Sequence, residues 1–355
     1  MTKDNRKVCL FVGSMEEGGA QRVISILSRK LVECGYDLTI FIYYDRQIQY
    51  NLDPKIKVIV LEGKTSSSGV FRNALYYRRF LRNYEGVVVS FLAIWNIFSM
   101  LCSAGLKKKI IVADRNDPRK IPRNRLLRLL RNTIYTHASA VVVQTENNKK
   151  YFTDDIKKKC SVIFNPTSLK ESGIALRTEK KDVICAVGRL VGQKNYEAML
   201  RAFAIVVGQH LEFNLWIYGE GKERDKLFDV AKTLGIDDKV VFKGHHDDVV
   251  NEICQCKIYV LSSDYEGMPN SLLEAMCSGL PVISTKVSGA VDVIEDGKNG
   301  ILVDVGDVEG MASKMTFLIE NEDYAKSMAL EATKLFNRLD PEEVTEQWIK
   351  IIGSV

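Results

Sequence analysis

The chain has 355 residues, of which 46% are hydrophobic, and it carries 50 Lys and Arg against 45 Asp and Glu. This length exceeds one ordinary hydrophobic core, so two domains are expected, and the absence of low-complexity tracts excludes a disordered or fibrous protein. The eight cysteines show no metal-ligand spacing, which favours reduced, buried thiols in a cytosolic protein.

The charge is divided unevenly along the chain. The first 165 residues hold 29 Lys and Arg against 14 Asp and Glu, a balance of +15, whereas the remainder holds 21 against 31, a balance of −10. This polarity predicts that the first half meets an anionic partner.

The first half alternates apolar runs with helical patterns. The apolar run Lys7–Val12 leads through a loop containing Gly18 and Gly19 into a helix that ends near Leu31. A strand, a glycine loop and a helix bring backbone N–H groups to phosphate, although this loop is neither G-x-G-x-x-G nor a P-loop. Further strands are predicted at 37–44, 56–61, 87–92, 109–112 and 141–144, with a helix at 70–83. This alternation predicts a parallel sheet covered on both faces.

Residues 86–106 contain no charged side chain and are long enough to span a bilayer. Polar residues such as Ser90, Asn96 and Ser99 interrupt the window. A strand followed by a helix is therefore favoured over a membrane span.

The most basic stretch is Lys107–Arg131, with ten Lys and Arg against two acidic residues. A helix is predicted after Pro122, and as a basic amphipathic helix it suits a membrane headgroup interface or the diphosphate of a lipid carrier. Packing of its leucines into the core, with a solvated basic face, is the alternative. Its predicted apolar face comprises Leu126, Leu127, Leu130 and Ile134, with Arg125, Arg128 and Arg131 off it.

Arg115 and Asn116 follow the predicted strand at 109–112. They are therefore expected at the carboxyl edge of the sheet, where ligands bind in open α/β folds. A salt-bridged structural turn is the alternative. The polar, irregular stretch Thr167–Lys181 closes the first half and is predicted to be the hinge between the domains.

The strand–helix pattern restarts with a strand at 183–187, followed by Gly188, Arg189 and Lys194 at the start of a helix that ends at Val207. Cations are disfavoured at this end of a helix dipole unless an anion lies between them, so an anion site is predicted. Two surface charges at a helix start are the alternative.

Later strands at 213–218 and 240–243 lead to loops, the second of which contains Gly244, His245, His246 and Asp247. The His-His-Asp run suggests a metal, but no distant ligand accompanies it, and an exposed turn is the alternative.

The stretch Val260–Pro281 organises the second half. A buried strand ends at Leu261, Glu266 lies on the following loop, and Glu274 lies just over one turn into a helix whose expected N-cap is Asn270 or Ser271. The amide end of that helix lies between two carboxylates, an arrangement suited to a diphosphate flanked by sugar hydroxyls.

Glu266 and Glu274, with Ala275-Met276 and Gly279-Leu280-Pro281-Val282 after them, resemble the Glu-x7-Glu signature of family 4 glycosyltransferases of the bacterial surface-polysaccharide type. The resemblance implies an α/β GT-B fold with two Rossmann-like, doubly wound parallel-sheet domains facing a cleft. It implies an acceptor- and membrane-facing domain at 1–165, a nucleotide-sugar-binding domain at 166–340, and a C-terminal helix within 341–355 that crosses back to the first domain.

The resemblance also implies residue roles. Arg189 and Lys194 would grip the donor diphosphate, Glu266 would face the donor sugar, and Glu274 would accept hydrogen bonds from ribose; Arg189, Lys194 and Glu266 form the expected catalytic set. Many relatives have a histidine near position 115, which this chain lacks, so Arg115 or Asn116 is expected to replace it. The expected substrate-binding residues are Gly18, Gly19, Arg115, Asn116, Gly188, Gly244, His245, Gly267, Met268, Pro269, Asn270, Ser271 and Glu274.

The function so implied is retaining transfer of a sugar from a UDP-sugar to a lipid-linked saccharide in capsule, exopolysaccharide or surface-glycan synthesis. No cofactor, essential metal or nucleic-acid partner is expected. The enzyme is expected in the cytoplasm, peripherally bound at the inner face of the cell membrane through Lys107–Arg131. The alternatives are a nucleotide-sugar epimerase or hydrolase on the same scaffold, a non-catalytic membrane-docking module, and a dinucleotide oxidoreductase, which the missing glycine motif disfavours.

Overall fold

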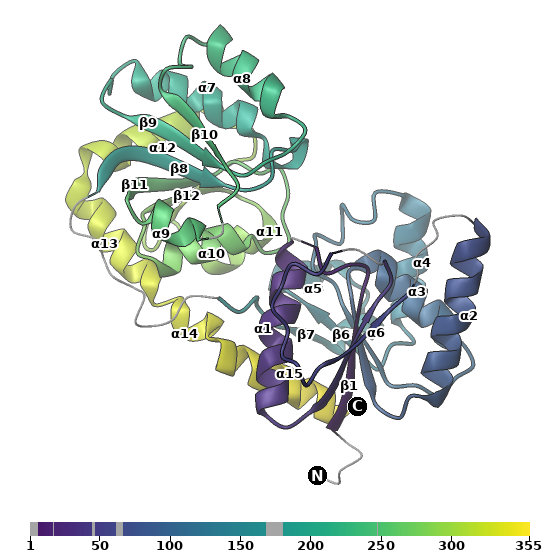
Figure 1. Ribbon diagram of the computed structural model, residues 1–355. Coiled ribbons are helices and arrows are strands. Elements are labelled where there is room, and N and C mark those ends of the chain that lie inside the picture. Colours follow the sequence, from purple (N-terminus) through teal and green to yellow (C-terminus); the bar gives the residue numbers. More distant parts are fainter. Residues whose placement is uncertain (1–5, 17, 45–46, 62–66, 168–179, 247) are drawn as a thin grey trace. The chain divides into compact units, whose positions relative to one another are not determined.

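The computed structural model describes residues 6–16, 18–44, 47–61, 67–167, 180–246 and 248–355 (Figure 1). It divides the chain into unit 1, Met1–Pro166 with Arg338–Val355, and unit 2, Thr167–Asn337. The boundaries expected after residues 165 and 340 thus move to 166 and 337. The second shift has a local reason, because the Arg338 guanidinium lies 4.5 Å from the ring centroid of Phe164 in unit 1. Most of the predicted hinge lies outside the described residues.

Unit 1 contains a seven-stranded sheet in the order β3-β2-β1-β4-β5-β6-β7, and its recorded strand pairs are all parallel. The strands are β1 (Lys7–Val12), β2 (Asp37–Ile42), β3 (Lys57–Val60), β4 (Val87–Phe91), β5 (Ile110–Ala113), β6 (Ala140–Val143) and β7 (Cys160–Val162). The helices are α1 (Gly19–Glu33), α2 (Ser67–Asn83), α3 (Ala93–Ser103), α4 (Arg125–Tyr135), α5 (Glu146–Tyr151), α6 (Asp154–Lys157) and α15 (Pro341–Ser354).

Helices cover both faces of this sheet. On one face, Ile24 and Leu27 of α1 share a buried cluster with Trp348 and Ile352 of α15, so the last helix of the chain completes the core of the first unit. On the other face, residues of α2, α3 and α4 share a second cluster that includes Tyr77, Met100 and Tyr135. Burial on both faces explains why the strands are nearly continuous apolar runs.

The uncharged window 86–106 folds as predicted, into strand β4 and helix α3. Among the helices that the structure describes, none combines the length and the apolar composition of a membrane span.

Helix α4 differs from the prediction in its orientation. Leu126 and Leu129 are 73% and 64% exposed, and Leu130 is exposed as well, whereas Arg131 is fully buried. The predicted alternative, a core-packed leucine face with a solvated basic face, is therefore wrong for Leu126, Leu130 and Arg131. Arg125 is exposed as that alternative expected, and the remaining residues of the two faces (Leu127, Arg128 and Ile134) are half-buried. The physical reason is the set of partners that Arg131 finds inside unit 1.

Arg131 is surrounded by acceptors and rings. Its guanidinium donates to the carbonyls of Ile121 at 2.7 Å and Pro118 at 3.0 Å, and it lies 3.6 Å from the Asp114 carboxylate. The rings of Tyr151 and Phe152 each lie 5.3 Å from its Cζ. A buried charge that is hydrogen-bonded and paired in this way fixes the rotation of α4 about its axis.

Unit 2 contains a six-stranded sheet in the order β10-β9-β8-β11-β12-β13, again with parallel recorded pairs. The strands are β8 (Lys181–Val187), β9 (Asn214–Tyr218), β10 (Val240–Gly244), β11 (Cys256–Leu261), β12 (Val282–Thr285) and β13 (Ile301–Val303). The helices are α7 (Tyr196–Val207), α8 (Arg224–Thr233), α9 (Val249–Ile253), α10 (Asn270–Cys277), α11 (Ser288–Val293), α12 (Val308–Glu320) and α13 (Glu322–Thr333); α14 (Phe336–Leu339) spans the unit boundary.

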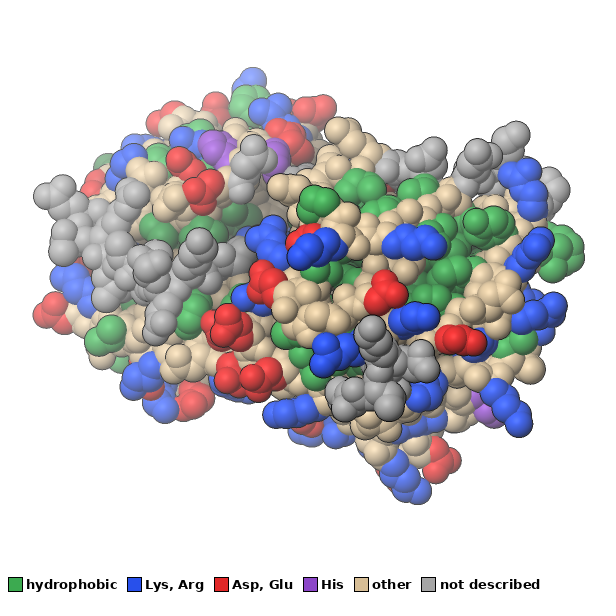
Figure 2. All heavy atoms as spheres, turned by 60° about the horizontal axis from the view of Figure 1, so that its bottom comes forward, with side chains coloured by type: hydrophobic (Ala, Val, Ile, Leu, Met, Phe, Trp, Pro, Cys, Tyr) green, Lys and Arg blue, Asp and Glu red, His purple; other side chains and the backbone are tan. Residues whose placement is uncertain are grey.

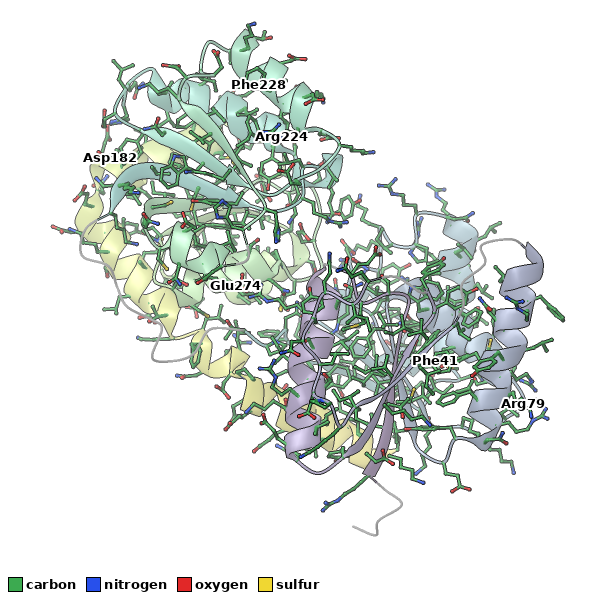
Figure 3. All side chains as sticks on the ribbon, in the orientation of Figure 1. Phe41, Arg79, Asp182, Arg224, Phe228 and Glu274 are labelled. Carbon is green, nitrogen blue, oxygen red and sulfur yellow. The ribbon has the colours of Figure 1, made fainter. Side chains whose placement is uncertain are left out.

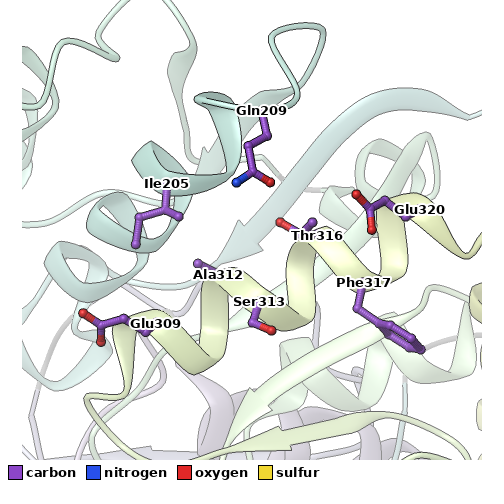
Figure 4. Close-up of a pocket in the computed structure, with 8 residues that line it drawn as sticks. All are labelled: Ile205, Gln209, Glu309, Ala312, Ser313, Thr316, Phe317 and Glu320. Atoms are coloured by element: carbon purple, nitrogen blue, oxygen red, sulfur yellow. The ribbon is translucent and has the colours of Figure 1, made fainter.

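One face of the second sheet packs against α7, α8 and α12. A shallow groove of about 460 Å³ opens between Gln209, just beyond the end of α7, and Thr316 of α12 (Figure 4). Helix α10 packs on the opposite face, where the Tyr259 hydroxyl of β11 donates to Ser271 Oγ at 2.8 Å. The groove is therefore not part of the loops that follow the strands, where a ligand is expected.

We predict that replacing Arg131 by Met destabilises the chain. The substitution leaves the buried Asp114 carboxylate without its cation, which costs about 3–5 kcal/mol of unfolding free energy. Chemical denaturation measures this loss, and R125M is the matched control because Arg125 is an exposed arginine of the same helix. Equal stability of the two variants would contradict the anchoring role of Arg131.

The loss of unfolding free energy in R131M should also depend on pH. Burial raises the pKa of Asp114 to about 6, while Arg131 opposes the rise. Because this folded-state pKa lies above the ordinary value of 3.8, the native state holds the proton more tightly than the unfolded state and loses stability as the pH rises from about 4 to about 6, above which the loss is complete. Without Arg131 the pKa rises further, so the destabilisation of R131M should be greater at pH 8 than at pH 5.

Candidate functional site

The second sheet reverses its strand order between β8 and β11, since β9 and β10 lie on one side and β12 and β13 on the other. In an open parallel sheet, ligands bind in the crevice at such a reversal, beyond the carboxyl ends of the strands. The loop that follows β8 carries Gly188, Arg189 and Lys194, and the loop that follows β11 carries Glu266. The topology therefore brings these two predicted segments together.

The two segments meet in an ion pair. Lys194 Nζ lies 2.7 Å from Glu266 Oε1, and the two side chains are 15% and 12% exposed. The Ser263 hydroxyl donates to the same carboxylate oxygen at 3.0 Å. Glu266 is thus a protein partner of Lys194, whereas the anion predicted between Arg189 and Lys194 stays a prediction. A largely buried pair of this kind is screened less by solvent than a surface pair.

The sequence suggested that Lys194 lies at the start of the long helix, but the structure places it before that helix. It ends a short 3-10 turn over Gly192–Lys194, and Asn195, with φ and ψ both at 46°, separates this turn from α7. Asn195 is one of the few residue types that adopt left-handed backbone angles readily. Its side-chain oxygen also accepts from the Ala198 N–H at 3.3 Å as the N-cap of α7.

Hydrogen bonds tie this turn to the loop after β11. Asn195 Nδ2 donates to Asp264 Oδ1 at 2.7 Å, the Asp264 N–H donates to the Gln193 carbonyl at 2.9 Å, and Gln193 Nε2 donates to the Tyr265 carbonyl at 2.9 Å. The Ser262 hydroxyl donates to the Lys194 carbonyl at 2.8 Å. The backbone that carries Lys194 is thus fixed to the backbone that carries Glu266.

Glycine leaves room for the lysine side chain. Gly188 has a φ of 155°, and a Cβ at this position would lie 2.8 Å from Lys194 Cε and 3.1 Å from the Tyr196 hydroxyl. That hydroxyl donates to the Gly188 carbonyl at 3.0 Å. Lys194 therefore reaches Glu266 by crossing directly over the glycine backbone. Arg189, next in the chain, is exposed.

Helix α10 begins one residue earlier than its predicted N-cap allows. Pro269 is the N-cap and makes no side-chain cap bond, so the expected capping by Asn270 or Ser271 is wrong. The Ser271 hydroxyl is engaged differently: it accepts from Tyr259 at 2.8 Å and donates to the Val187 carbonyl at 3.2 Å. These bonds join the first turn of α10 to the end of β8.

Glu274 extends from α10 and is 4% exposed (Figure 3). The loop before α10, which holds Gly267, Met268 and Pro269, is buried and lies against α11. A Cβ on Gly289 of α11 would come within 2.5 Å of the Gly267 carbonyl oxygen. The absence of a side chain at Gly289 thus lets the loop and the start of α10 lie close against α11.

Gly244 and His245, which are expected to bind substrate, lie at the end of β10, two strands from β8. Gly244 ends β10 with a φ of 72°, and its carbonyl accepts from the Gly219 N–H at 2.7 Å. His245 is exposed, whereas His246 packs edge-on against the Tyr218 ring. Asp247 lies outside the described residues. Within the described part of the chain, no three His, Cys, Asp or Glu side chains form a group that could hold a metal ion.

Unit 1 has its own reversal of strand order, between β1 and β4. The predicted glycines follow β1: the Tyr50 hydroxyl donates to the Gly18 carbonyl at 3.0 Å and accepts from its N–H at 3.2 Å, and Gly19 begins α1. The Trp95 indole of α3 covers the first glycine of the loop, Gly13.

Arg115 and Asn116 follow β5 in the same unit, but in different environments. Arg115 is buried, donates to the Ile163 carbonyl at 3.3 Å, and lies 5.3 Å from the Trp348 ring centroid of α15. Burial lowers the pKa of its guanidinium to about 9. Asn116 is half-buried and accepts from Asn148 Nδ2 at 3.3 Å. The sugar contacts expected of these two residues stay predictions.

Asn195, Asp264 and Ser263 position the site but were missed in the sequence. The signal for Asn195 was present, because an Asn directly before a helical pattern is a typical N-cap and tolerates left-handed angles. The partners of Asp264 and Ser263 lie on other loops, and nothing in the sequence reveals them.

Three comparisons place the chain among known proteins. Residues 169–335 match the family described as Glycosyl transferases group 1. The GalNAc-alpha-(1->4)-GalNAc-alpha-(1->3)-diNAcBac-PP-undecaprenol alpha-1,4-N-acetyl-D-galactosaminyltransferase of Campylobacter jejuni is 26% identical over 364 residues, covering 98% of this chain and 99% of its own. The amylovoran biosynthesis glycosyltransferase AmsD of Erwinia amylovora is 25% identical over 355 residues, covering 97% and 98%.

Among solved structures, Anabaena Alr3699/HepE in complex with UDP and glucose matches with a TM-score of 0.84 at 18% identity, covering 99% of this chain and 100% of that chain. Together with the two parallel sheets, this likeness confirms the predicted fold class, two doubly wound α/β domains of the GT-B type.

We predict that G188A slows sugar transfer without unfolding the chain. The added Cβ would push aside the Lys194 side chain, and displacing a charged group from a reaction centre costs about tenfold or more in rate. G192A is the matched control, because the described neighbour of a Cβ on Gly192 would be the end of the flexible Glu223 side chain, at 3.2 Å from Oε1. Comparable rates of sugar transfer in the two variants, at similar Tm, would show that the space that Gly188 leaves for the Lys194 side chain is not needed for the reaction.

A second prediction concerns the Asn195–Asp264 contact. N195D keeps the N-cap oxygen but sets two carboxylates against each other, so kcat should fall about ten- to hundredfold. D264N alone keeps an acceptor for Asn195 and should have a small effect. The double variant N195D/D264N reverses donor and acceptor and should recover most of the rate. If the double variant is equally folded but does not recover the rate, the Asn195–Asp264 hydrogen bond does not position Lys194.

Proposed function

We propose that this chain moves a sugar from a UDP-sugar to a lipid-linked saccharide with retention of anomeric configuration. The premise is that the chain is a glycosyltransferase whose residues 169–335 belong to the glycosyl transferases group 1. The observation that carries the proposal is the Lys194–Glu266 ion pair at the strand-order reversal of unit 2. It unites a cation suited to phosphate with a carboxylate suited to sugar hydroxyls.

The donor diphosphate would lie against Arg189, Lys194 and the start of α10. Breaking a sugar–phosphate bond builds negative charge on the departing nucleotide, and preorganised cations stabilise that charge in a site with little water. The planar fork of Arg189 and the point charge of Lys194 serve this purpose in different ways. We propose that these two cations, rather than a metal ion, carry the leaving-group charge.

The carboxylates would recognise hydroxyl groups. Glu266 is held by Lys194 and Ser263, so its remaining lone pairs have a fixed direction toward a donor sugar. Glu274 would accept hydrogen bonds from the ribose. Since Glu274 is then occupied, a pair of catalytic carboxylates as in a glycosidase fits less well, and the donor phosphate itself would accept the acceptor's proton.

The acceptor class is proposed from the relatives. The Campylobacter enzyme acts, by its name, on a saccharide carried by PP-undecaprenol, and the Erwinia protein serves amylovoran biosynthesis. UDP is bound in the Anabaena structure. We therefore propose a role in surface-glycan or exopolysaccharide assembly, at the inner face of the cell membrane, with Lys107–Arg131 facing anionic lipid.

The test is a donor screen that reads UDP or GDP release with and without lipid-diphosphate saccharides. We expect UDP release that depends on the acceptor, is unchanged by EDTA, and falls about a hundredfold or more in K194A and E274A. K298A is the matched control, because Lys298 is an exposed lysine of the same unit that pairs with nearby Glu295.

Each other outcome has a distinct meaning. Equal UDP release without acceptor would indicate a nucleotide-sugar hydrolase. Wild-type activity in both K194A and E274A would end the assignment of this site.

A further inference from the structure

Helices α2, α3 and α4 form one layer on unit 1, with α3 in contact with both neighbours. The outer side of this layer is unusually apolar. Phe71 is 68% exposed, and Figure 2 shows hydrophobic side chains gathered among Lys and Arg on the part of the molecule that unit 1 forms. The exposed large hydrophobic residues of the layer are Val70, Phe71, Leu75, Tyr76, Ile94, Leu101, Leu126, Leu129 and Leu130.

The apolar surface is built into the fold. On α4, the burial of Arg131 turns Leu126 and Leu129 outward. On α2, Tyr77 and Leu81 fill the core, so the preceding Phe71, Leu75 and Tyr76 are left on the outer side. Several exposed apolar side chains on adjacent helices favour an interaction site in a folded protein.

The charge of the same layer is of one sign. The helices α2, α3 and α4 hold seven arginines, four on α2 and three on α4, and no Asp or Glu; one of the seven, Arg131, is buried and does not contribute to the outer side. Arg79 extends from the outer part of α2 (Figure 3). At the end of α2, Lys108 donates to the carbonyls of Arg82 and Tyr84 at 3.0 and 2.9 Å.

We propose that the outer side of the α2–α3–α4 layer docks on an anionic lipid bilayer, with the apolar side chains of α2 and α4 inserted among the headgroups. Apolar residues flanked by arginines suit such an interface, because the rings and leucines enter the acyl boundary while the guanidinium groups meet lipid phosphates. A second copy of the chain is a poor occupant, since it would bring two arginine-rich faces without acids together.

This docking extends the membrane contact beyond Lys107–Arg131, since α2 lies outside that segment. It rests on the proposed function only in taking the acceptor to be membrane-bound. The membrane docking and the proposed sugar transfer can fail separately, because vesicle binding is measured without donor or acceptor.

The test is flotation of the full chain with phosphatidylcholine vesicles that contain or lack phosphatidylglycerol. We expect the chain to bind the acidic vesicles, and to bind them less as the salt concentration rises. Binding should fall about tenfold in F71S/L75S and in L126S/L129S. The matched control is F228S/L330S, which removes two comparably exposed side chains from unit 2 and should bind as wild type.

A charge variant separates the two contributions. R72Q/R79Q should weaken binding to the acidic vesicles and leave the apolar residues in place. Equal binding by wild type and F71S/L75S would overturn the proposal. So would a concentration-dependent dimer of the wild type that F71S/L75S abolishes, because a second copy would then cover this face.

Discussion

The contact on which the site of unit 2 depends is the salt bridge between Lys194 and Glu266, 72 positions apart in the sequence. It exists because β8 and β11 are parallel neighbours at the strand-order reversal, so the loops that leave their carboxyl ends share one crevice. A change of strand order would leave both residues in place along the chain and yet dissolve the pair. The proposed chemistry is thus a consequence of topology before it is a matter of side-chain type.

The surroundings of this ion pair limit its freedom. Asn195 ends the turn behind Lys194 in a left-handed conformation, and its amide faces Asp264 on the other loop. Gly188 lets the lysine stem pass close to the backbone. Such scaffolding lowers the reorganisation needed when charge develops on a departing phosphate, which is the main way in which fixed charges accelerate a reaction. A donor bound here would exchange part of the lysine's attraction to Glu266 for attraction to phosphate.

In unit 1, one buried charge decides which side of a helix faces the core. By residue type, α4 has a leucine-rich face that favours the core and arginines that favour solvent. Arg131 finds two carbonyls, a carboxylate and two rings inside the unit, and this arrangement outweighs the burial of three leucines. The partners come from residues 114–121 and 151–152, so no pattern within the helix reveals the inversion. The outward leucines, together with those of α2, give unit 1 a surface suited to lipid.

Local pattern was enough for the parallel strands, the split of residues 86–106 into β4 and α3, and the grouping of Glu266 and Glu274 around the start of α10, because strand runs, turn residues and helix periodicity are written in neighbouring positions. It missed the short strands β7, β12 and β13, whose three or four residues are too few to show a pattern. The partner of Lys194, the cap of α10, the burial of Arg115 under Trp348 and the rotation of α4 follow from contacts between segments distant in sequence. Those contacts depend on strand order and packing, so they emerge only when the chain is folded.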